Sequence, residues 1–167
     1  TVSRTDTVIV VGFLILVQGT GALAGFWLPA IAPEVGQSLG LSPSLIAYPV
    51  LILYIFAMIS SLMAGGFVTR FGAWRSSQAA LILIGISHLM FMNGSLIFLM
   101  LGSIILGSAY GLLTPPASHL LSKIVTPKNR NLVFSIRFTG VPLGGILAGL
   151  LAPPIALEYG WRESMLV

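Results

Sequence analysis

The sequence of 167 residues contains no cysteine, which excludes a disulfide bond and a thiolate metal site within it. Acidic residues are scarce as well: Asp and Glu together number four, and all lie at the ends of apolar segments or between them. The two histidines, His88 and His119, are far apart and show no metal-ligand spacing. No two acids form a plausible catalytic pair. The composition therefore argues against an enzyme, a metal site or another cofactor.

Charge of either sign is also rare. Charged residues make up 7% of the chain, against about 25% in a typical soluble domain. Hydrophobic residues make up 56%, and the mean hydropathy is +1.02. Uninterrupted apolar runs of about 20 residues are typical of transmembrane helices, whereas barrel strands alternate and are shorter. We therefore predict an all-α membrane protein, one domain over residues 1–167, with helices near 7–32, 43–67, 76–93, 95–122 and 131–156. A sixth helix begins at "GWRESMLV".

The few basic residues fall in alternate connections. Seven of the eight lie in the N-terminal tail, in the second connection or near the fourth: Arg4, Arg70, Arg75, Lys123, Lys128, Arg130 and Arg137. Lys and Arg collect in cytoplasmic loops. We therefore place the N-terminus, 68–75 and 123–131 in the cytoplasm, in a multi-pass protein of the bacterial inner membrane. The formal charge of +4 then reflects topology and contact with the lipid bilayer, and indicates no nucleic-acid partner.

Glycine and proline are frequent inside the predicted helices, where small residues allow close helix contact. The first and fourth helices share the spacing G-x-x-x-G-x-x-x-P, with an offset of 86 residues: Gly21, Gly25 and Pro29, then Gly107, Gly111 and Pro115. The two helices run in opposite directions, as an inverted repeat of three plus three helices requires. Chance in a glycine-rich chain is the alternative explanation. Tryptophans stand at span ends, at positions 27, 74 and 161, which is typical of interfacial anchors.

The segment "GGFVTRFGAWR" (65–75) resembles the signature loop of the major facilitator superfamily, between its second and third helices. Gly65, Arg70, Gly72 and Arg75 match the family pattern, and Thr69 replaces its usual Asp. Gly65 is expected to allow close helix contact, and Gly72 to adopt positive φ.

The segment "FTGVPLGGILAGLLAPP", with packing residues Gly140, Pro142 and Gly144, resembles the fifth helix of that family. The sequences of several segments look closest to the cyanate-permease-like bacterial branch of that family. The resemblance implies the N-terminal six-helix bundle of a twelve-helix transporter, whose C-terminal six-helix half is expected as a partner.

Arg137 is the leading candidate for substrate binding, since its neighbours in "VFSIRFTGVPLGG" are apolar and it lies about 10 Å beyond Arg130 along a helix. An anionic substrate group would suit it. Snorkelling to the cytoplasmic surface and a carboxylate in the other half are the alternatives. Further candidates lie within the first, second and fourth helices: Gln18, Thr20, Tyr54, Tyr110, Thr114 and His119. For each of these, an interhelical hydrogen bond is the alternative role.

We therefore predict secondary transport of a small solute, an organic or inorganic anion, by alternating access. The alternative is a non-transporting membrane fragment or scaffold that lacks the C-terminal half.

Overall fold

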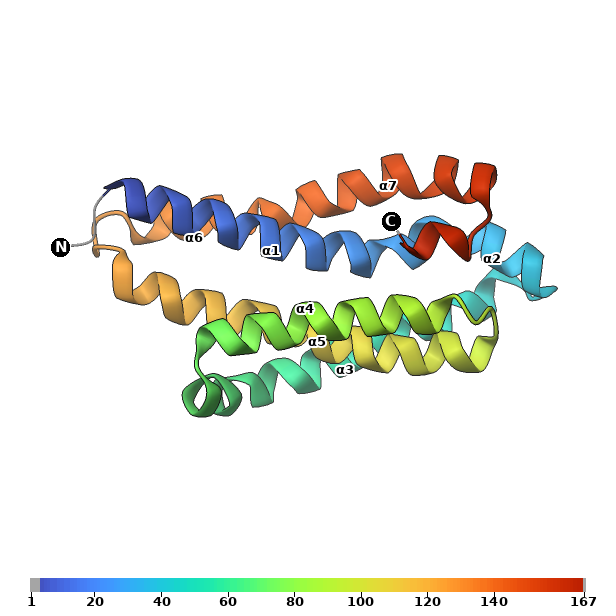
Figure 1. Cartoon of the computed structure of the whole chain (residues 1–167), viewed down its shortest axis with the longest axis horizontal. Coiled ribbons are helices and arrows are strands. Elements are labelled where there is room, and N and C mark those ends of the chain that lie inside the picture. Colours follow the sequence, from blue (N-terminus) through green and yellow to red (C-terminus); the bar gives the residue numbers. More distant parts are fainter. Residues whose placement is uncertain (1–3, 167) are drawn as a thin grey trace.

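The computed structural model describes residues 4–166. Every regular element within these residues is a helix, which confirms the all-α fold class. The elements are α1 (Arg4–Ala30), α2 (Ala32–Leu39), α3 (Pro43–Phe71), α4 (Ala73–Phe91), α5 (Leu96–Ile124), α6 (Arg130–Phe138), α7 (Gly140–Tyr159) and the 3₁₀ turn η1 (Glu163–Leu166). They form one elongated bundle in which the long helices lie side by side (Figure 1).

Glycine ends the helices where the chain must turn sharply. Among the described residues, positive φ occurs only at four glycines, and each lies in a connection: Gly40, Gly72, Gly94 and Gly160. Gly72 has φ +82 and links α3 directly to α4, as expected from the signature segment. A side chain at this φ would be strained. The turn therefore explains why glycine stands between Arg70 and Arg75.

Three pairs of long helices dominate the packing. α1 packs against α7, α3 packs against α5, and α4 packs against the same α5 (Figure 1). Counting spans from the N-terminus, these first two pairs are spans one with five and four with two. A three-plus-three inverted repeat exchanges spans one with four and two with five, so it converts one pair into the other. The observed pairing is the one that such a repeat requires.

Glycines line the α1–α7 and α3–α5 contacts. A Cβ atom at Gly140 would lie 2.7 Å from the Ile15 carbonyl oxygen of α1, and one at Gly144 would meet the backbone around Gly19. Gly107 and Gly111 of α5 face the backbone of α3 in the same way. Gly21 and Gly25 of α1 lie against Tyr110 of α5, and Gly21 also lies against Leu113. The prolines contribute less, since Pro29 and Pro115 are half-buried and Pro142 is exposed.

The structure differs from the predicted spans in two places. The segment 131–156 is interrupted at Thr139, which separates α6 from α7, and a short helix α2 follows the first span. Four helices of the described residues are long and apolar enough to cross a membrane: Thr7–Ala30, Ser44–Phe71, Leu96–Ile124 and Arg130–Tyr159. α4 is less apolar because Arg75, Ser76, Ser77 and Gln78 occupy its first turns.

Two tryptophans are not the interfacial anchors that the sequence indicates. Trp27 is 3% exposed and Trp161 is 6% exposed. The Trp27 indole Nε1 donates a hydrogen bond of 3.3 Å to Ser164 Oγ, which fastens η1 to α1. Only Trp74 is exposed, and its ring stacks on Phe13. A span end can face a neighbouring helix as well as the lipid interface, and position along the chain does not distinguish the two.

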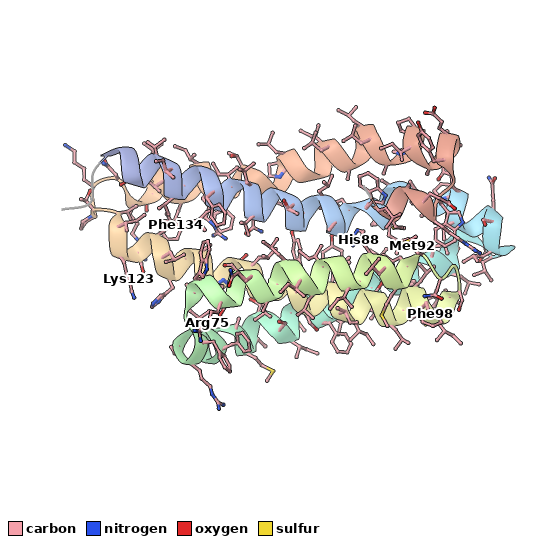
Figure 2. The ribbon with its side chains drawn as sticks, in the orientation of Figure 1. Arg75, His88, Met92, Phe98, Lys123 and Phe134 are labelled. Carbon is pink, nitrogen blue, oxygen red and sulfur yellow. The ribbon has the colours of Figure 1, made fainter. Side chains whose placement is uncertain are left out.

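The basic connections gather at one end of the bundle. The beginning of α1, the α3–α4 turn and the α5–α6 connection lie together there (Figure 1). Arg75 and Lys123 lie at this end, whereas Met92 and Phe98 lie at the other (Figure 2). That this end faces the cytoplasm stays a prediction from the distribution of Lys and Arg.

Cysteine labelling tests this orientation, since the chain has no cysteine of its own. Gln37 and Lys128 are exposed at opposite ends. In intact cells, a membrane-impermeant maleimide should label Gln37→Cys in the full-length protein and should leave Lys128→Cys unlabelled until the cells are lysed. The full-length protein with any cysteine outside these 167 residues replaced, and none introduced, serves as the background. Labelling of Lys128→Cys from outside would reverse the orientation.

Candidate functional site

Arg137 forms the centre of a buried polar cluster. Its side chain has 0% exposure, although it is a charged residue in an apolar bundle. Its Nη2 donates a hydrogen bond of 2.7 Å to Gln18 Oε1 of α1, and Nη1 donates a longer one of 3.5 Å to Ser118 Oγ of α5. The guanidinium also lies 4.8 Å from the ring centroid of Phe138. Three helices thus meet at one cation.

Local sequence explains how Arg137 reaches this position. Pro127 lies in the connection before α6, and α6 then carries Arg137 in its last turn. A cation is favoured there because the helix dipole places partial negative charge at a helix C-terminus. Directly after Arg137, the chain reaches Thr139 and Gly140, where the helix is interrupted and α1 comes close. Because Gly140 has no side chain, α1 can approach closely, and this brings Gln18 within hydrogen-bonding distance of Arg137.

The charge of Arg137 is not balanced within the described chain. Neither acceptor is a carboxylate, and Nε has no hydrogen-bond partner although it is buried. Gln18 stands at the middle of the apolar span Thr7–Ala30, so the cation lies deep in the membrane segment. Inserting an arginine at such a depth costs about 2.5–3.5 kcal/mol on translocon scales. An uncompensated cation at this cost makes Arg137 the leading candidate for a functional residue.

The other predicted residues do not all join this cluster. Gln18 does, whereas Thr20 is exposed on another side of α1 and donates to the Leu16 carbonyl at 2.9 Å. Tyr110 and Thr114 are half-buried on α5, and Tyr110 lies against α1. The remaining two, Tyr54 and His119, are exposed, and neither is a hydrogen-bond partner of Arg137.

Thr20 instead lines a cavity of about 180 Å³ between α1, α4 and η1, away from Arg137. His88 lines the same cavity and its Nδ1 lies 3.1 Å from the Ile84 carbonyl oxygen. Successive helix residues are rotated by about 100°, so Gln18 and Thr20 point to different sides of α1. This rotation separates two residues that are neighbours in the sequence.

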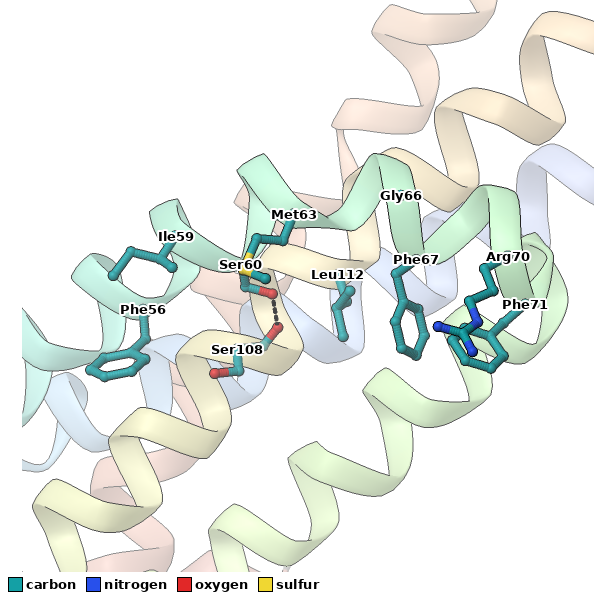
Figure 3. Close-up of a pocket in the computed structure, with 10 residues that line it drawn as sticks. All are labelled: Phe56, Ile59, Ser60, Met63, Gly66, Phe67, Arg70, Phe71, Ser108 and Leu112. Atoms are coloured by element: carbon teal, nitrogen blue, oxygen red, sulfur yellow. Dashed lines mark hydrogen bonds between the residues drawn. The ribbon is translucent and has the colours of Figure 1, made fainter.

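Ser118 is the member of the cluster that the sequence analysis missed. It lies one helical turn after Thr114, so the two share a face of α5. That spacing next to a predicted polar residue was the available signal. The sequence analysis also did not identify Ser60, which makes a separate contact. Its Oγ donates a hydrogen bond of 2.7 Å to the Ser108 carbonyl oxygen and joins α3 to α5 (Figure 3).

The signature segment lies outside the Arg137 cluster. Arg70 and Arg75 are exposed, and Thr69 donates only to the nearby Gly66 carbonyl, at 2.9 Å. Arg70 lies over the Phe71 ring at the edge of a hollow of about 580 Å³ between α3 and α5 (Figure 3). The expected close contact at Gly65 is not made by the described residues, since a Cβ there would meet nothing within 4 Å.

No three potential metal-ligating side chains converge among residues 4–166. The absence of a resident metal or cofactor stays a prediction from the sequence.

Comparison with known proteins decides the family. The profile of the Major Facilitator Superfamily matches residues 11–167. The chain belongs to the major facilitator superfamily. This confirms the resemblance carried by the signature segment and the fifth helix, while the cyanate-permease-like branch stays a prediction.

The chain is similar to a transporter of known sequence and to one of known structure. The chain is 28% identical over 151 residues to the gallate transporter of Pseudomonas putida. The matched region covers 87% of this chain and 32% of that protein. A crystal structure of a mutant of the peptide transporter POT in complex with sulfate has 21% identity and a TM-score of 0.69. That match covers 94% of this chain and 33% of the other. The latter likeness concerns the fold. The chain therefore spans about one third of the length of each relative.

Proposed function

We propose that the full-length protein is a secondary transporter that moves a small organic or inorganic anion across the bacterial inner membrane by alternating access, and that it is not an enzyme. One observation carries the proposal: Arg137 is a buried cation beside the middle of a membrane span, and no carboxylate of the described residues pairs with it. Transporter sites near the membrane midplane place such charges where a substrate of opposite sign binds.

The family and its relatives support this proposal. Members of a transporter superfamily of this fold act on small solutes, and the relative from Pseudomonas putida is named for gallate, the anion of a carboxylic acid. Arg suits such a group because its planar guanidinium forms paired hydrogen bonds with a carboxylate. The other partners that we propose are the lipid bilayer and a C-terminal six-helix half.

We propose Arg137 as the core of the binding site, with Gln18 beside it as its hydrogen-bond partner. Tyr110 and Thr114 on α5 are proposed at its edge, where half-burial leaves part of each side chain accessible. Thr20, Tyr54 and His119 stay weaker candidates, since all three are exposed and none donates to or accepts from Arg137 in a hydrogen bond.

Thermal stabilisation of the purified full-length protein tests the proposal directly. Gallate, benzoate, cyanate and sulfate serve as anionic probes, and benzamide serves as the neutral control for benzoate. We expect at least one anion to raise the melting temperature, benzamide to leave it unchanged, and the stabilising anion to accumulate in proteoliposomes. Stabilisation by neutral solutes without any anion would contradict the proposed substrate class. A folded protein that binds and transports none of the probes would favour the scaffold alternative.

A further inference from the structure

The hydrogen bonds of Arg137 leave one edge of its guanidinium incompletely used. The group has five N–H donors and carries a full charge. On the edge formed by Nε and Nη2, only Nη2 has an acceptor among the described residues, the amide oxygen of Gln18 at 2.7 Å, and Nε has none there. Leaving a buried donor unsatisfied is costly, and the neutral amide does not compensate the charge. The arrangement is therefore incomplete on the edge that a two-oxygen anion fits.

We propose that Gln18 is a substitute acceptor, which holds Arg137 while no anion is bound and which the substrate anion displaces. This inference rests on the proposed transport of an anion. A carboxylate presents two oxygens side by side, so it matches Nε and Nη2 together, whereas the amide offers one oxygen. The exchange replaces one hydrogen bond to a neutral acceptor by two hydrogen bonds to a charged one, and it satisfies the orphaned Nε. Gln18 then turns away from Arg137.

The position of the cluster links this exchange to the helices. Gln18 belongs to α1, Arg137 to the last turn of α6, and Ser118 to α5. Release of Gln18 removes a hydrogen bond between α1 and α6, beside the place where Gly140 meets Ile15. Ser118 is the half-buried member of the cluster, on α5. The displaced contact thus connects occupancy of the site to the contact between the first and fifth spans.

Two substitutions at Gln18 give opposite results if this inference is right. Gln18→Glu supplies an internal carboxylate that completes the Nε and Nη2 edge and competes with the substrate. We expect it to weaken binding of the stabilising anion by at least about tenfold and to raise the melting temperature of the anion-free protein. Gln18→Leu removes the competing acceptor, so we expect affinity equal to that of the wild type or higher, and a lower melting temperature without anion.

The measurement is anion titration by calorimetry on the purified full-length protein, with the probe that stabilises the wild type most among gallate, benzoate, cyanate and sulfate. Gln37→Glu makes the same chemical change at an exposed position and should alter neither affinity nor melting temperature. Affinity at least tenfold weaker in Gln18→Leu would show instead that Gln18 contacts the substrate, and would overturn the inference. A lower anion-free melting temperature in Gln18→Glu would overturn it as well, without any ligand. If no anion binds the wild type, the proposed function itself fails, and the anion-free melting temperatures still report on the internal contact.

Discussion

Arg137→Gln is expected to abolish anion transport by the full-length protein while leaving its abundance in the membrane near that of the wild type. Arg137 is buried, and no carboxylate of the described residues neutralises it, so the substrate anion is its proposed counter-charge. Removing one partner of a buried, hydrogen-bonded charge pair costs about 2–5 kcal/mol, so transport should fall by about 30-fold to a few thousand-fold. The neutral glutamine should be tolerated, because it removes a buried charge that the fold does not compensate. Initial uptake of the anion, normalised to membrane abundance, is the measurement.

Two further variants separate anion binding from other roles of Arg137. Arg137→Lys should retain part of the uptake, because it keeps the charge but loses the planar pair of donors. Arg130→Gln is the matched control: Arg130 lies in the same helix but is exposed, and we expect little change. Uptake by Arg137→Gln equal to that of the wild type would show that the buried cation has a structural role, and would remove the main reason to expect an anion.

Gly144→Ala is expected to prevent most of the protein from folding. A methyl group at Gly144 would lie 2.7 Å from both the Ala22 Cβ and the Leu23 backbone nitrogen, and would also meet the Gly19 carbonyl oxygen. Backbone atoms cannot move aside as the end of a flexible side chain can, so α7 and α1 must separate. Contact between membrane helices depends on close packing of this kind, because lipid is as apolar as the helices themselves. Separation would weaken the van der Waals contacts along the whole α1–α7 pair, on which the position of Arg137 depends.

Gly149→Ala provides the control within the same helix, since a Cβ at Gly149 would meet nothing within 4 Å. It should fold as the wild type does, because alanine also favours a helix more than glycine. Fluorescence-detected gel filtration of the full-length variants after heating gives the yield of monodisperse protein and its melting temperature. A Gly144→Ala protein with wild-type yield and melting temperature would mean that α1 and α7 are less tightly packed than the structure shows.

The sequence by itself determined the class of protein, its helices and its family. Low charge and long apolar runs specify membrane helices because the cost of burying polar groups in lipid adds up along each segment. Glycines with positive φ, such as Gly72, fall at turns for a reason that is equally local. The signature segment could be recognised from the sequence because it consists of eleven consecutive residues. The interruption at Thr139 carried no comparable signal, since threonine and glycine are common inside helices of such proteins.

Only the tertiary structure decided which polar residues meet. Arg137 contacts Gln18, which is 119 residues away, whereas Thr20, two residues from Gln18, lines a different cavity with His88. The physical reason is that the long helices are apolar on every side. Hydrophobic periodicity reports how a helix is rotated only when one of its faces is polar. In uniformly apolar helices, rotation is set by packing, here by glycines such as Gly140 and Gly144 against the backbone of α1. The sequence could therefore identify a buried arginine as unusual, but only the packed helices gave it glutamine as a neighbour and left its Nε without a partner.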